Sequence, residues 1–228
     1  MQRGFLTRVT AGRPAVTLKL ALTLDGRIAT ASGESKWITG PEARRRVHAL
    51  RMSHDAVLVG GGTARADDPM LTVREMGALR QPLRIVASRA IDLPRDGGLA
   101  GSAAEVPLWI LHGPGASVGP WQTLGARTVE VPVTGDRLDA HAMMTALGME
   151  GLTRVLCEGG GQLAASLLSA DLVDEIVVFT AGLSLGADAR PAVGALRIAA
   201  LTGGVRFRLE GSEAVGGDLL HRWVRRLA

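Results

Sequence analysis

The sequence predicts an α/β fold with a mixed, mostly parallel central sheet, helices on both faces and antiparallel strands at its C-terminal end. Three observations indicate this fold class. Strand-like apolar runs alternate with helical patterns along most of the chain. Several of these runs are apolar throughout, such as residues 56–59 and 176–178, which is typical of strands covered on both faces. The last two runs follow each other across glycines without a helix between them, so we expect the sheet to end in an antiparallel pair.

The expected elements follow one another in a regular order. Strands are expected over residues 15–23, 55–60, 83–87, 106–111, 128–131, 154–158, 175–180, 205–210 and 219–224. A helix is expected to begin at Pro41, because proline is favoured at the first helical position and apolar residues over 43–50 then recur on one face. Further helices are expected over residues 138–147 and 162–170. Residues 94–118 are rich in Gly, Pro and Ala around one of these short strands, and we expect a surface loop there rather than a linker.

The composition fits a globular chain with a substantial core. Of the 228 residues, 46% are hydrophobic, which excludes disordered and fibrous classes. Cys157 is the single cysteine, so an internal disulfide is impossible and a cytoplasmic location is expected. The sequence shows no signal-peptide pattern and no run of about 18 apolar residues, so we expect neither secretion nor a membrane span.

The charge pattern argues against nucleic-acid binding. The chain carries 26 Lys and Arg against 22 Asp and Glu, with a pI of about 10.4. These basic residues are spread along the chain and interleaved with acids, whereas a nucleic-acid groove needs a concentrated basic patch. Aromatic residues make up only 3% and do not alternate with basic clusters, so a stacking platform is also missing. We therefore expect no nucleic-acid partner.

Two glycine clusters follow strands and are candidates for binding an anion. They are Gly60–Gly62 and Gly159–Gly161, the second of which leads into a helix. Glycine lets backbone N–H groups approach a phosphate closely, and a helix N-terminus adds unpaired donors. Either cluster by itself is equally typical of a tight turn, but two at the carboxyl ends of strands favour a ligand. A standard Rossmann dehydrogenase is disfavoured, because the strand after the second cluster ends in Thr180 rather than in a ribose-binding acid.

Several other residues admit two interpretations. Arg51 lies on the core-facing edge of its helix, so it either pairs with a buried carboxylate or binds an anionic ligand. Trp37 closes a long polar loop and either packs on the core or faces a ligand. Asp68 precedes a proline and is typical of a turn, which leaves Asp67 freer to act. Cys157 lies among apolar neighbours and is expected to be a buried, inert thiol.

Several sequence blocks, taken together, resemble a known enzyme family. They are VTLKLA with LDGRIA within residues 16–29, GESKWIT at 33–39, VGGGT with ADDP and LTVR within 59–74, and EGGG with LVDE within 158–175. In this order they closely resemble the reductase domain of the bifunctional deaminase-reductases of riboflavin biosynthesis, the RibD family. The resemblance implies a dihydrofolate-reductase-like fold, NADPH as the cofactor, 5-amino-6-(5-phosphoribosylamino)uracil reductase activity and a homodimer.

The resemblance also implies which residues act. Those expected to bind NADPH are Ala21, Trp37, Thr63, Asp67, Ser88, Gly160, Gly161, Gln162, Leu163, Ala164, Ala165 and Ser166. Those expected to bind the substrate are Ser35, Arg51, Leu71, Arg74 and Glu158. The two arginines suit a ribose 5-phosphate, because guanidinium groups form charge-assisted bonds to phosphate, and Ser88 with Arg89 suits the 2′-phosphate of the cofactor. The expected catalytic residues are Lys19, Asp67 and Glu158; Glu158 holds one edge of the pyrimidine, and the proton comes from Lys19, Asp67 or a water.

The deaminase half of such proteins has no counterpart in the sequence. Its zinc signature needs clustered ligands, whereas the chain has one Cys and five His without metal-ligand spacing, so no metal is expected. We expect either a piece of a bifunctional protein or a stand-alone reductase that works beside a separate deaminase. Residues 1–14 resemble the segment that joins the two halves and are expected to be linker-like, with residues 15–228 as a single reductase domain.

Two other functions stay open from the sequence. A reductase of the same fold could act on another pyrimidine or on a pteridine, or the chain could be a non-catalytic nucleotide-binding partner of a deaminase. Turnover of the phosphoribosyl substrate distinguishes the first alternative from the riboflavin-pathway reductase. Tight NADPH binding without NADPH oxidation would indicate the second.

Overall fold

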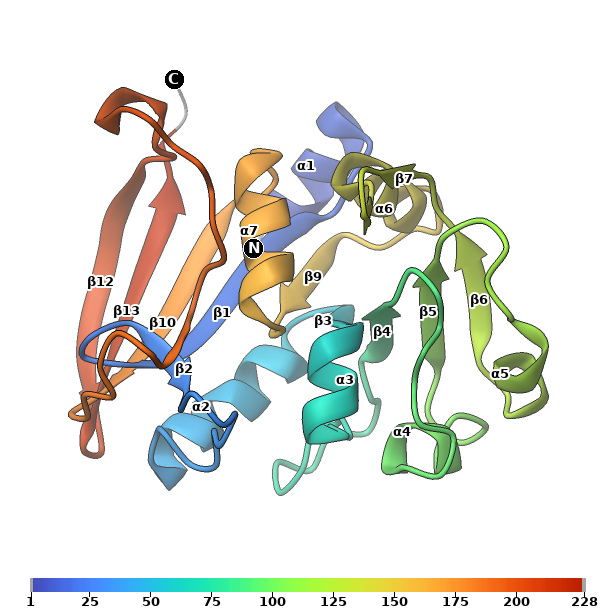
Figure 1. The fold of residues 1–228 in the computed structure, drawn as a ribbon, viewed down its shortest axis with the longest axis horizontal. Helices are drawn as coiled ribbons and strands as arrows, with labels where there is room; N and C mark the ends of the chain where they lie inside the picture. The colour runs from blue at the N-terminus through green and yellow to red at the C-terminus, as the bar shows by residue number, and fades with distance from the viewer. Residues whose placement is uncertain (1, 227–228) are drawn as a thin grey trace. The chain divides into compact units, whose positions relative to one another are not determined.

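The computed structural model describes residues 2–226 of the chain. These residues fold into two compact units (Figure 1). The first unit comprises residues 2–15 and 48–159, and the second comprises residues 16–47 and 160–226. Each unit contains its own set of strands, and the ends of these strands position the residues of the candidate site.

The first unit is built on a parallel sheet. Its strands lie in the order β9 (Arg154–Cys157), β3 (Ala56–Gly60), β4 (Leu83–Ala87), β5 (Leu108–His112) and β6 (Arg127–Glu130). All neighbouring pairs in this series are parallel. In β3, every residue over 56–59 is buried, as the continuous apolar run predicts for a strand covered on both faces.

Helices cover both faces of this sheet. α3 (Gly61–Asp67) connects β3 to β4, and α6 (Ala140–Met149) connects β6 back to β9 after a short hairpin of β7 (Val133–Thr134) and β8 (Arg137–Leu138). The two connections run in opposite directions across the sheet. Because crossovers between parallel strands are nearly always right-handed, opposite directions place the two helices on opposite faces. Figure 1 shows α3 in front of the sheet.

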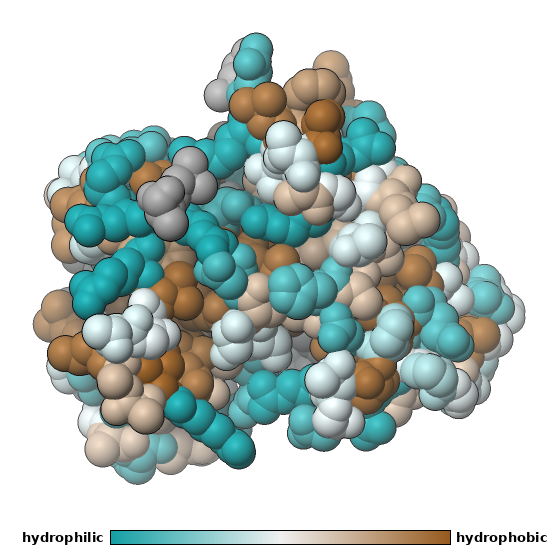
Figure 2. All heavy atoms as spheres, turned by 90° about the horizontal axis from the view of Figure 1, so that it is seen from above, coloured by the Kyte–Doolittle hydropathy of each residue, from teal (hydrophilic) through white to brown (hydrophobic). Residues whose placement is uncertain are grey.

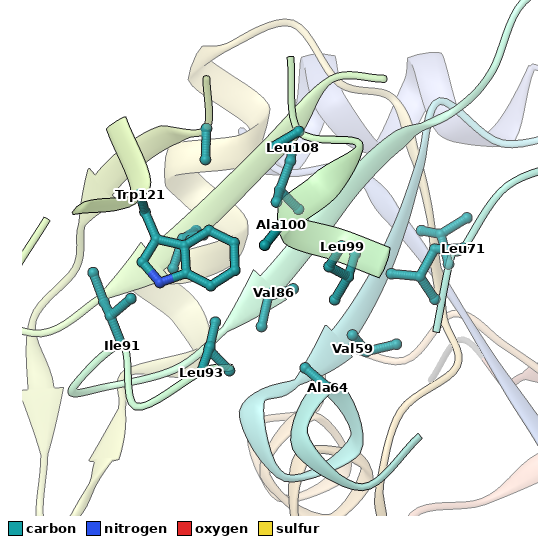
Figure 3. Packing of buried hydrophobic residues seen from close by; sticks show 14 residues of the cluster. Val59, Ala64, Leu71, Val86, Ile91, Leu93, Leu99, Ala100, Leu108 and Trp121 are labelled. Atoms are coloured by element: carbon teal, nitrogen blue, oxygen red, sulfur yellow. The ribbon is translucent and has the colours of Figure 1, made fainter. Parts of the chain in front are cut away.

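The segment over residues 94–118 contains the expected short strand, as β5, but it also contains a short helix, α4 (Gly98–Gly101), that the surface loop did not include. It leads into α5 (Gly119–Thr123). Leu99 and Ala100 are 4% and 3% exposed, and Figure 3 shows both side chains inside the buried cluster. Arg84 of β4, itself fully buried, donates to the hydroxyl and carbonyl oxygens of Ser102 at 2.7 and 3.0 Å. This short helix was not expected because small residues pack closely on the sheet without the periodicity that marks a long helix.

The segment expected to be linker-like contains a docked helix, α1 (Arg3–Ala11). This helix ends at Gly12, whose φ of +67° favours glycine. Arg8 Nε donates to the carbonyl oxygen of Gly148, near the end of α6, at 2.9 Å. A Cβ atom on Gly148 would overlap the Gly12 carbonyl oxygen, so the two backbones touch. That residues 1–14 join a second domain, and that residues 15–228 act as one domain, stay predictions.

The second unit is built on four strands, in the order β12 (Phe207–Val215), β13 (Asp218–Arg225), β10 (Glu175–Ala181) and β1 (Ala15–Thr23). β1 and β10 are parallel, whereas β10 with β13 and β12 with β13 are antiparallel. The antiparallel C-terminal pair is confirmed, because a tight turn with Gly216 at a φ of +62° joins β12 directly to β13. The mixed, mostly parallel α/β architecture expected from the sequence is therefore confirmed.

Smaller elements complete the second unit. α2 (Pro41–Met52) begins at the expected proline and continues into the first unit, and α7 (Gly161–Ser169) follows the second glycine cluster. β2 (Arg27–Ala29) pairs with β11 (Arg190–Pro191), and a 3-10 turn covers Leu201–Gly203. On the face in Figure 2, hydrophilic and hydrophobic side chains alternate in small groups. Over residues 2–226, the helices are all too short or too polar to span a membrane.

Candidate active site

Glycine and polar residues gather at one edge of the sheet in the first unit. β3, β4 and β9 are parallel neighbours, so their carboxyl ends meet at the same edge. The residues that directly follow these three strands are Gly61, Ser88 and Glu158. This edge therefore carries the first glycine cluster together with two of the expected binding residues.

Arg51 and Glu158 form a buried ion pair with two hydrogen bonds. Arg51 Nε and Nη2 donate to the two carboxylate oxygens of Glu158 at 2.6 and 2.9 Å, and the side chains are 13% and 7% exposed. Arg51 Nη1 donates to the Thr72 carbonyl oxygen at 2.8 Å. Burial by itself would lower the pKa of Arg51, but the carboxylate of Glu158 raises it above its ordinary value. Of the two interpretations of Arg51, the structure bears out pairing with a buried carboxylate.

Side-chain hydrogen bonds hold the loop over residues 68–82 in place. Asp68 ends α3 with a φ of +39°, and its carboxylate accepts two backbone N–H groups at the start of α4 at 2.6 and 3.3 Å. The side chain of Gln81 bonds to the N–H and the carbonyl oxygen of Val73 at 2.7 and 3.1 Å. The turn role expected for Asp68 is confirmed, and its carboxylate also caps α4.

Leu71 and Arg74 lie in this loop and differ in burial. Leu71 is 2% exposed and has a φ of +55°, which is a rare conformation for leucine. Its buried side chain therefore anchors a strained stretch of backbone. Arg74 is exposed, and among residues 2–226 its guanidinium group has no hydrogen bond or ion pair.

His48 lies beside Arg51 and Arg74, although the sequence patterns did not indicate a role for it. It precedes Arg51 by three residues on α2, so the two side chains share a helical face, and its Nδ1 accepts the N–H of Arg74 at 3.3 Å. Burial lowers the pKa of His48, and the charges of Arg51 and Arg74 lower it further. Glu158 and the Thr72 carbonyl group act in the opposite direction. The i, i+3 spacing from Arg51 is the feature of the sequence that points to His48.

The start of α3 has bare N–H groups and no space for a side chain. Gly60 caps the helix without a side-chain hydrogen bond, and a Cβ atom on Gly61 would lie 2.9 Å from Ser88 Oγ. Ser88 is 5% exposed and donates to Asp92 Oδ1 at 2.9 Å. Asp92 in turn pairs with Arg65 of α3 at 2.8 Å. The serine expected near the 2′-phosphate therefore already has an acidic partner.

In the second unit, Lys19 and Ala21 lie on the same face of β1, because alternate residues of a strand point the same way. Thr17 shares this face and registers with Glu175 of β10. Glu175 accepts a hydrogen bond from Thr17 Oγ1 at 3.1 Å and pairs with Arg222 at 2.9 Å. Lys19 therefore lies on the same face of the sheet as the Glu175 carboxylate, which already interacts with Thr17 and Arg222.

The second glycine cluster forms the start of α7. Gly160 has a φ of +67°, and no side chain caps the first N–H groups of the helix. A Cβ atom on Gly161 would lie 2.9 Å from the Pro191 carbonyl oxygen, so only glycine fits at this position. A helix start without a side-chain cap, with backbone close around it, suits the binding of a pyrophosphate.

Trp37 is 67% exposed, so the interpretation that it packs on the core is wrong. The guanidinium carbon of Arg44 lies 4.6 Å from the centre of its ring, and Arg44 Nη1 donates to the Thr39 carbonyl oxygen at 2.8 Å. Ser35 lies half-buried in the same loop. Trp37 thus offers an exposed aromatic surface that a cation–π contact holds in place.

The expected site residues fall in both units. Arg51, Thr63, Asp67, Leu71, Arg74, Ser88 and Glu158 belong to the first unit, and Lys19, Ala21, Ser35, Trp37 and residues 160–166 belong to the second. Within the first unit, Thr63 and Asp67 lie four residues apart on α3 and share one helical face. The structure thus places the whole expected substrate set except Ser35 in the first unit.

Cys157 takes no part in this chemistry. Its side chain is fully buried, and burial raises the pKa of the thiol to about 12, as expected for an inert cysteine. In the described part of the chain, His, Cys, Asp and Glu side chains form no group of three or more that could hold a metal ion.

Comparison with known proteins assigns the chain to a family. Residues 14–221 match the family described as RibD C-terminal domain. The chain belongs to this family. This RibD C-terminal domain is 35% identical to the riboflavin biosynthesis protein RibD of Escherichia coli, over 96% of the chain and 62% of that protein. It is 38% identical to the 2,5-diamino-6-ribosylamino-4(3H)-pyrimidinone 5′-phosphate reductase of Methanothermobacter thermautotrophicus, over 91% of the chain and 96% of that protein.

Solved structures agree with this assignment. The solved structure of RibD from Acinetobacter baumannii matches this chain with a TM-score of 0.86 and 30% sequence identity. The match covers 99% of this chain and 62% of the other. The dihydrofolate-reductase-like fold implied by the resemblance is therefore confirmed. The chain spans about three fifths of the length of these two RibD proteins and nearly the whole length of the archaeal reductase.

Proposed function

We propose that this chain uses NADPH to reduce the ribosyl group of 5-amino-6-(5-phosphoribosylamino)uracil to a ribityl group in riboflavin biosynthesis. Membership of the RibD C-terminal domain family supports an oxidoreductase, since its relatives carry the names of riboflavin biosynthesis proteins and of a pyrimidinone phosphate reductase. The observation that carries the proposal is the buried Arg51–Glu158 pair at the strand edge. It presents a carboxylate of fixed orientation, which can accept N–H groups from one edge of a pyrimidine.

The residues present fit a phosphorylated dinucleotide. Both glycine clusters begin helices whose first N–H groups have no side-chain cap, and in both a Cβ atom would collide with neighbouring atoms. The start of α7 suits the pyrophosphate, and Ser88 with Arg89 suits the 2′-phosphate. When bound, NADPH supplies the hydride that reduces C1′ of the sugar.

The chain itself supplies orientation and a proton. Arg51 holds Glu158 in position, and the loop over residues 68–82 presents Arg74 beside this pair. The exposed ring of Trp37 offers a stacking surface for a planar group. Lys19, Asp67 and a water are the candidate proton donors, and holding the reacting groups in place lowers the entropic part of the barrier.

Spectroscopic loss of NADPH tests the proposal. The purified chain should consume NADPH with 5-amino-6-(5-phosphoribosylamino)uracil as the substrate. In Glu158→Gln, kcat/KM should fall about 10- to 100-fold with little change in the Kd for NADPH, because a charged hydrogen-bond partner of the substrate is lost. Glu150→Gln, which alters an exposed ion pair with Arg127, is the matched control. If none of the phosphoribosyl pyrimidines supports NADPH consumption, the assignment is contradicted.

A second substrate is favoured by one comparison. The archaeal relative that matches over nearly its whole length is named for the 2,5-diamino-pyrimidinone, which still carries the amino group that a deaminase removes. Turnover of the aminated compound in preference to the uracil would place reduction before deamination. Comparing kcat/KM for the two compounds under identical conditions decides the order.

The proposal includes the location, the oligomeric state and the partner of the enzyme. We place the chain in the cytoplasm, as a homodimer that works with a deaminase domain or a separate deaminase. Light scattering on the purified chain should then give about twice the mass of 23.8 kDa. A mass of one chain at micromolar concentration would contradict the dimer.

A further inference from the structure

The carboxylate of Asp25 joins two turns of the second unit that are distant in sequence. It accepts the N–H of Leu185 at 3.2 Å and the N–H of Gly186 at 2.7 Å. The hydroxyl group of Thr23 donates to it at 2.5 Å. The bonds from Thr23 and from these N–H groups lower the pKa of Asp25 to about 2, although burial acts in the opposite direction. Asp25 is therefore ionised at neutral pH, and its hydrogen bonds are charge-assisted.

The same turn holds the segment over residues 185–194 at a second point. The carbonyl oxygen of Gly26 accepts the N–H of Ala192 at 3.0 Å, and between the two points β11 pairs with β2. The bond from Ala192 joins backbone to backbone, whereas the bonds at the start of the segment depend on the side chain of Asp25. Replacing Asp25 therefore releases one end of the segment and leaves the other end attached.

This segment lies against the first turn of α7. The N–H of Gly194 donates to the carbonyl oxygen of Gly161 at 2.8 Å. A Cβ atom on Gly194 would lie 3.4 Å from the Cβ of Ala165, and one on Gly161 would lie 2.9 Å from the carbonyl oxygen of Pro191. The backbone around the proposed pyrophosphate position therefore belongs to the segment that Asp25 holds.

The segment also contacts the loop that carries Trp37. A Cβ atom on Gly33 of this loop would lie 2.8 Å from Nη2 of Arg190, the first residue of β11. Residues 185–194 thus touch two places in the second unit where residues expected to bind NADPH lie, the Trp37 loop and the start of α7. A displacement of this segment would reach both.

We propose that Asp25 is a positioning residue for the cofactor, whose carboxylate keeps residues 185–194 against the start of α7. This inference rests on the proposed function, which makes NADPH the cofactor. A ligand whose site is formed in only a fraction of the molecules binds with an apparent Kd raised by the inverse of that fraction. Loss of the carboxylate should therefore weaken NADPH binding, although Asp25 acts only through the segment.

Fluorescence titration with NADPH tests the proposal. In Asp25→Ala, the Kd for NADPH should rise about 5- to 10-fold, which corresponds to a segment that is in place in about one molecule in five to ten. Asp25→Asn keeps one oxygen that can accept a backbone N–H, so its Kd should rise only about two- to threefold.

Adenosine 2′-monophosphate distinguishes a local effect from a general one. This nucleotide has no pyrophosphate and, under the proposed function, binds beside Ser88 and Arg89 of the first unit. Calorimetric titrations with it should give the wild-type affinity in both Asp25 variants. A variant that is destabilised throughout would lose affinity for both ligands.

Asp139→Ala is the matched control. The carboxylate of Asp139, in the first unit, likewise accepts a backbone N–H, from Ala142 at 2.8 Å, and a hydroxyl group, from Thr134 at 2.9 Å. Its loss removes the same kinds of hydrogen bond at a place that carries none of the expected site residues. Asp139→Ala should bind NADPH and adenosine 2′-monophosphate like the wild type.

Hydrogen–deuterium exchange of the unliganded proteins reports on the segment directly. In Asp25→Ala, the amides over residues 185–194 should exchange faster than in the wild type, because their acceptors are lost or move apart. Amides inside β10 and α6 should keep their wild-type rates. The increase should be smaller in Asp25→Asn, in the same order as the Kd for NADPH.

The outcomes separate the positioning role from the proposed function. Wild-type exchange over residues 185–194 in Asp25→Ala, or faster exchange with an unchanged Kd for NADPH, would overturn the positioning role and leave the function standing. Equal weakening of NADPH and adenosine 2′-monophosphate would also overturn it. The expected binding pattern without reduction of any phosphoribosyl pyrimidine would support the positioning role and contradict the function. Wild-type protein that binds neither NADPH nor NADH would contradict both.

Discussion

The neighbours of Ser88 decide what this residue can bind. Its hydroxyl donates to Asp92, and Asp92 pairs with Arg65 on α3. A carboxylate beside the hydroxyl repels a phosphate, whereas the guanidinium group of Arg65 attracts one. Under the proposed function, in which Ser88 faces the 2′-phosphate, the balance between these two side chains sets how strongly the protein favours NADPH over NADH.

Replacing Asp92 by Asn tests this balance. Asn keeps an oxygen that can accept the Ser88 hydrogen bond, removes the negative charge and frees Arg65 for the cofactor. NADPH affinity should rise about fivefold, or about 1 kcal/mol, because the repulsion between the Asp92 carboxylate and the 2′-phosphate is removed near the surface. NADH affinity should stay the same, because NADH has no 2′-phosphate.

Fluorescence titration with each cofactor measures the effect. Asp96→Asn, at an exposed aspartate a few residues further along, is the matched control and should change neither affinity. Equal changes for NADPH and NADH would show that Ser88 does not face the 2′-phosphate.

At the scale of elements, Asp55 connects the beginnings of two neighbouring strands, β3 and β9. Asp55 Oδ2 accepts the N–H and the hydroxyl of Thr153, each at 2.7 Å, and the N–H of Arg154 at 2.9 Å. Burial by itself would raise the pKa of Asp55, but these hydrogen bonds outweigh it and hold the pKa below its ordinary value. One carboxylate thereby holds β9 in register beside β3.

Asp55→Asn should lower the free energy of unfolding by about 1 kcal/mol at pH 7, a modest value because the site is partly exposed to solvent. A carboxyl group with a lowered pKa in the folded state stabilises above its unfolded pKa of about 3.9, and this contribution disappears as the pH falls through the folded pKa. The difference between wild type and variant should therefore stay constant from about pH 7 to 5, begin to shrink near pH 4, and disappear as the pH falls through the lowered pKa of the folded state.

Urea unfolding at a series of pH values measures this difference. Asp136→Asn, at an aspartate that is 87% exposed, should leave stability almost unchanged throughout. A gap between wild type and Asp55→Asn that persists undiminished at pH 3 would contradict an electrostatic origin.

At the scale of the whole molecule, each unit contains one helix that begins at a glycine cluster and some of the expected site residues. The first unit contains the Arg51–Glu158 pair and the loop over residues 68–82. The second contains the start of α7 and the exposed ring of Trp37. Both sets belong to a chain in the RibD C-terminal domain family, whose bifunctional members are considerably longer. Reduction is therefore the proposed activity to test on this chain.

The chain should reduce its substrate without metal and without deaminating it. A chelator should leave the rate of NADPH consumption unchanged, because zinc deaminases need clustered His and Cys ligands that this sequence does not contain. No ammonia should be released from the aminated pyrimidine. An ammonia assay run in parallel with NADPH consumption checks both expectations, and metal-dependent release of ammonia would contradict them.

Local patterns predicted most of the strands well. β4 has the expected bounds, because an apolar run flanked by polar residues reports burial directly. α1 escaped prediction as a docked helix because its contact with α6 depends on a glycine-sized approach between backbones at Gly148 rather than on an apolar face. His48 escaped prediction because its partner is the backbone of Arg74, 26 positions further along.

The sequence by itself determined the α/β class, the order of the elements, the family and the residue types at the site, because periodicity, glycine clusters and motif blocks are local properties of the chain. Only the tertiary structure decided which partners these residues have. Arg51 and Glu158 are 107 positions apart in the sequence. The local sequence around either residue does not show whether Arg51 pairs with a carboxylate or binds a ligand. That choice follows from strand order, because the parallel strands β3 and β9 end at one edge and bring Glu158 to the helix that carries Arg51.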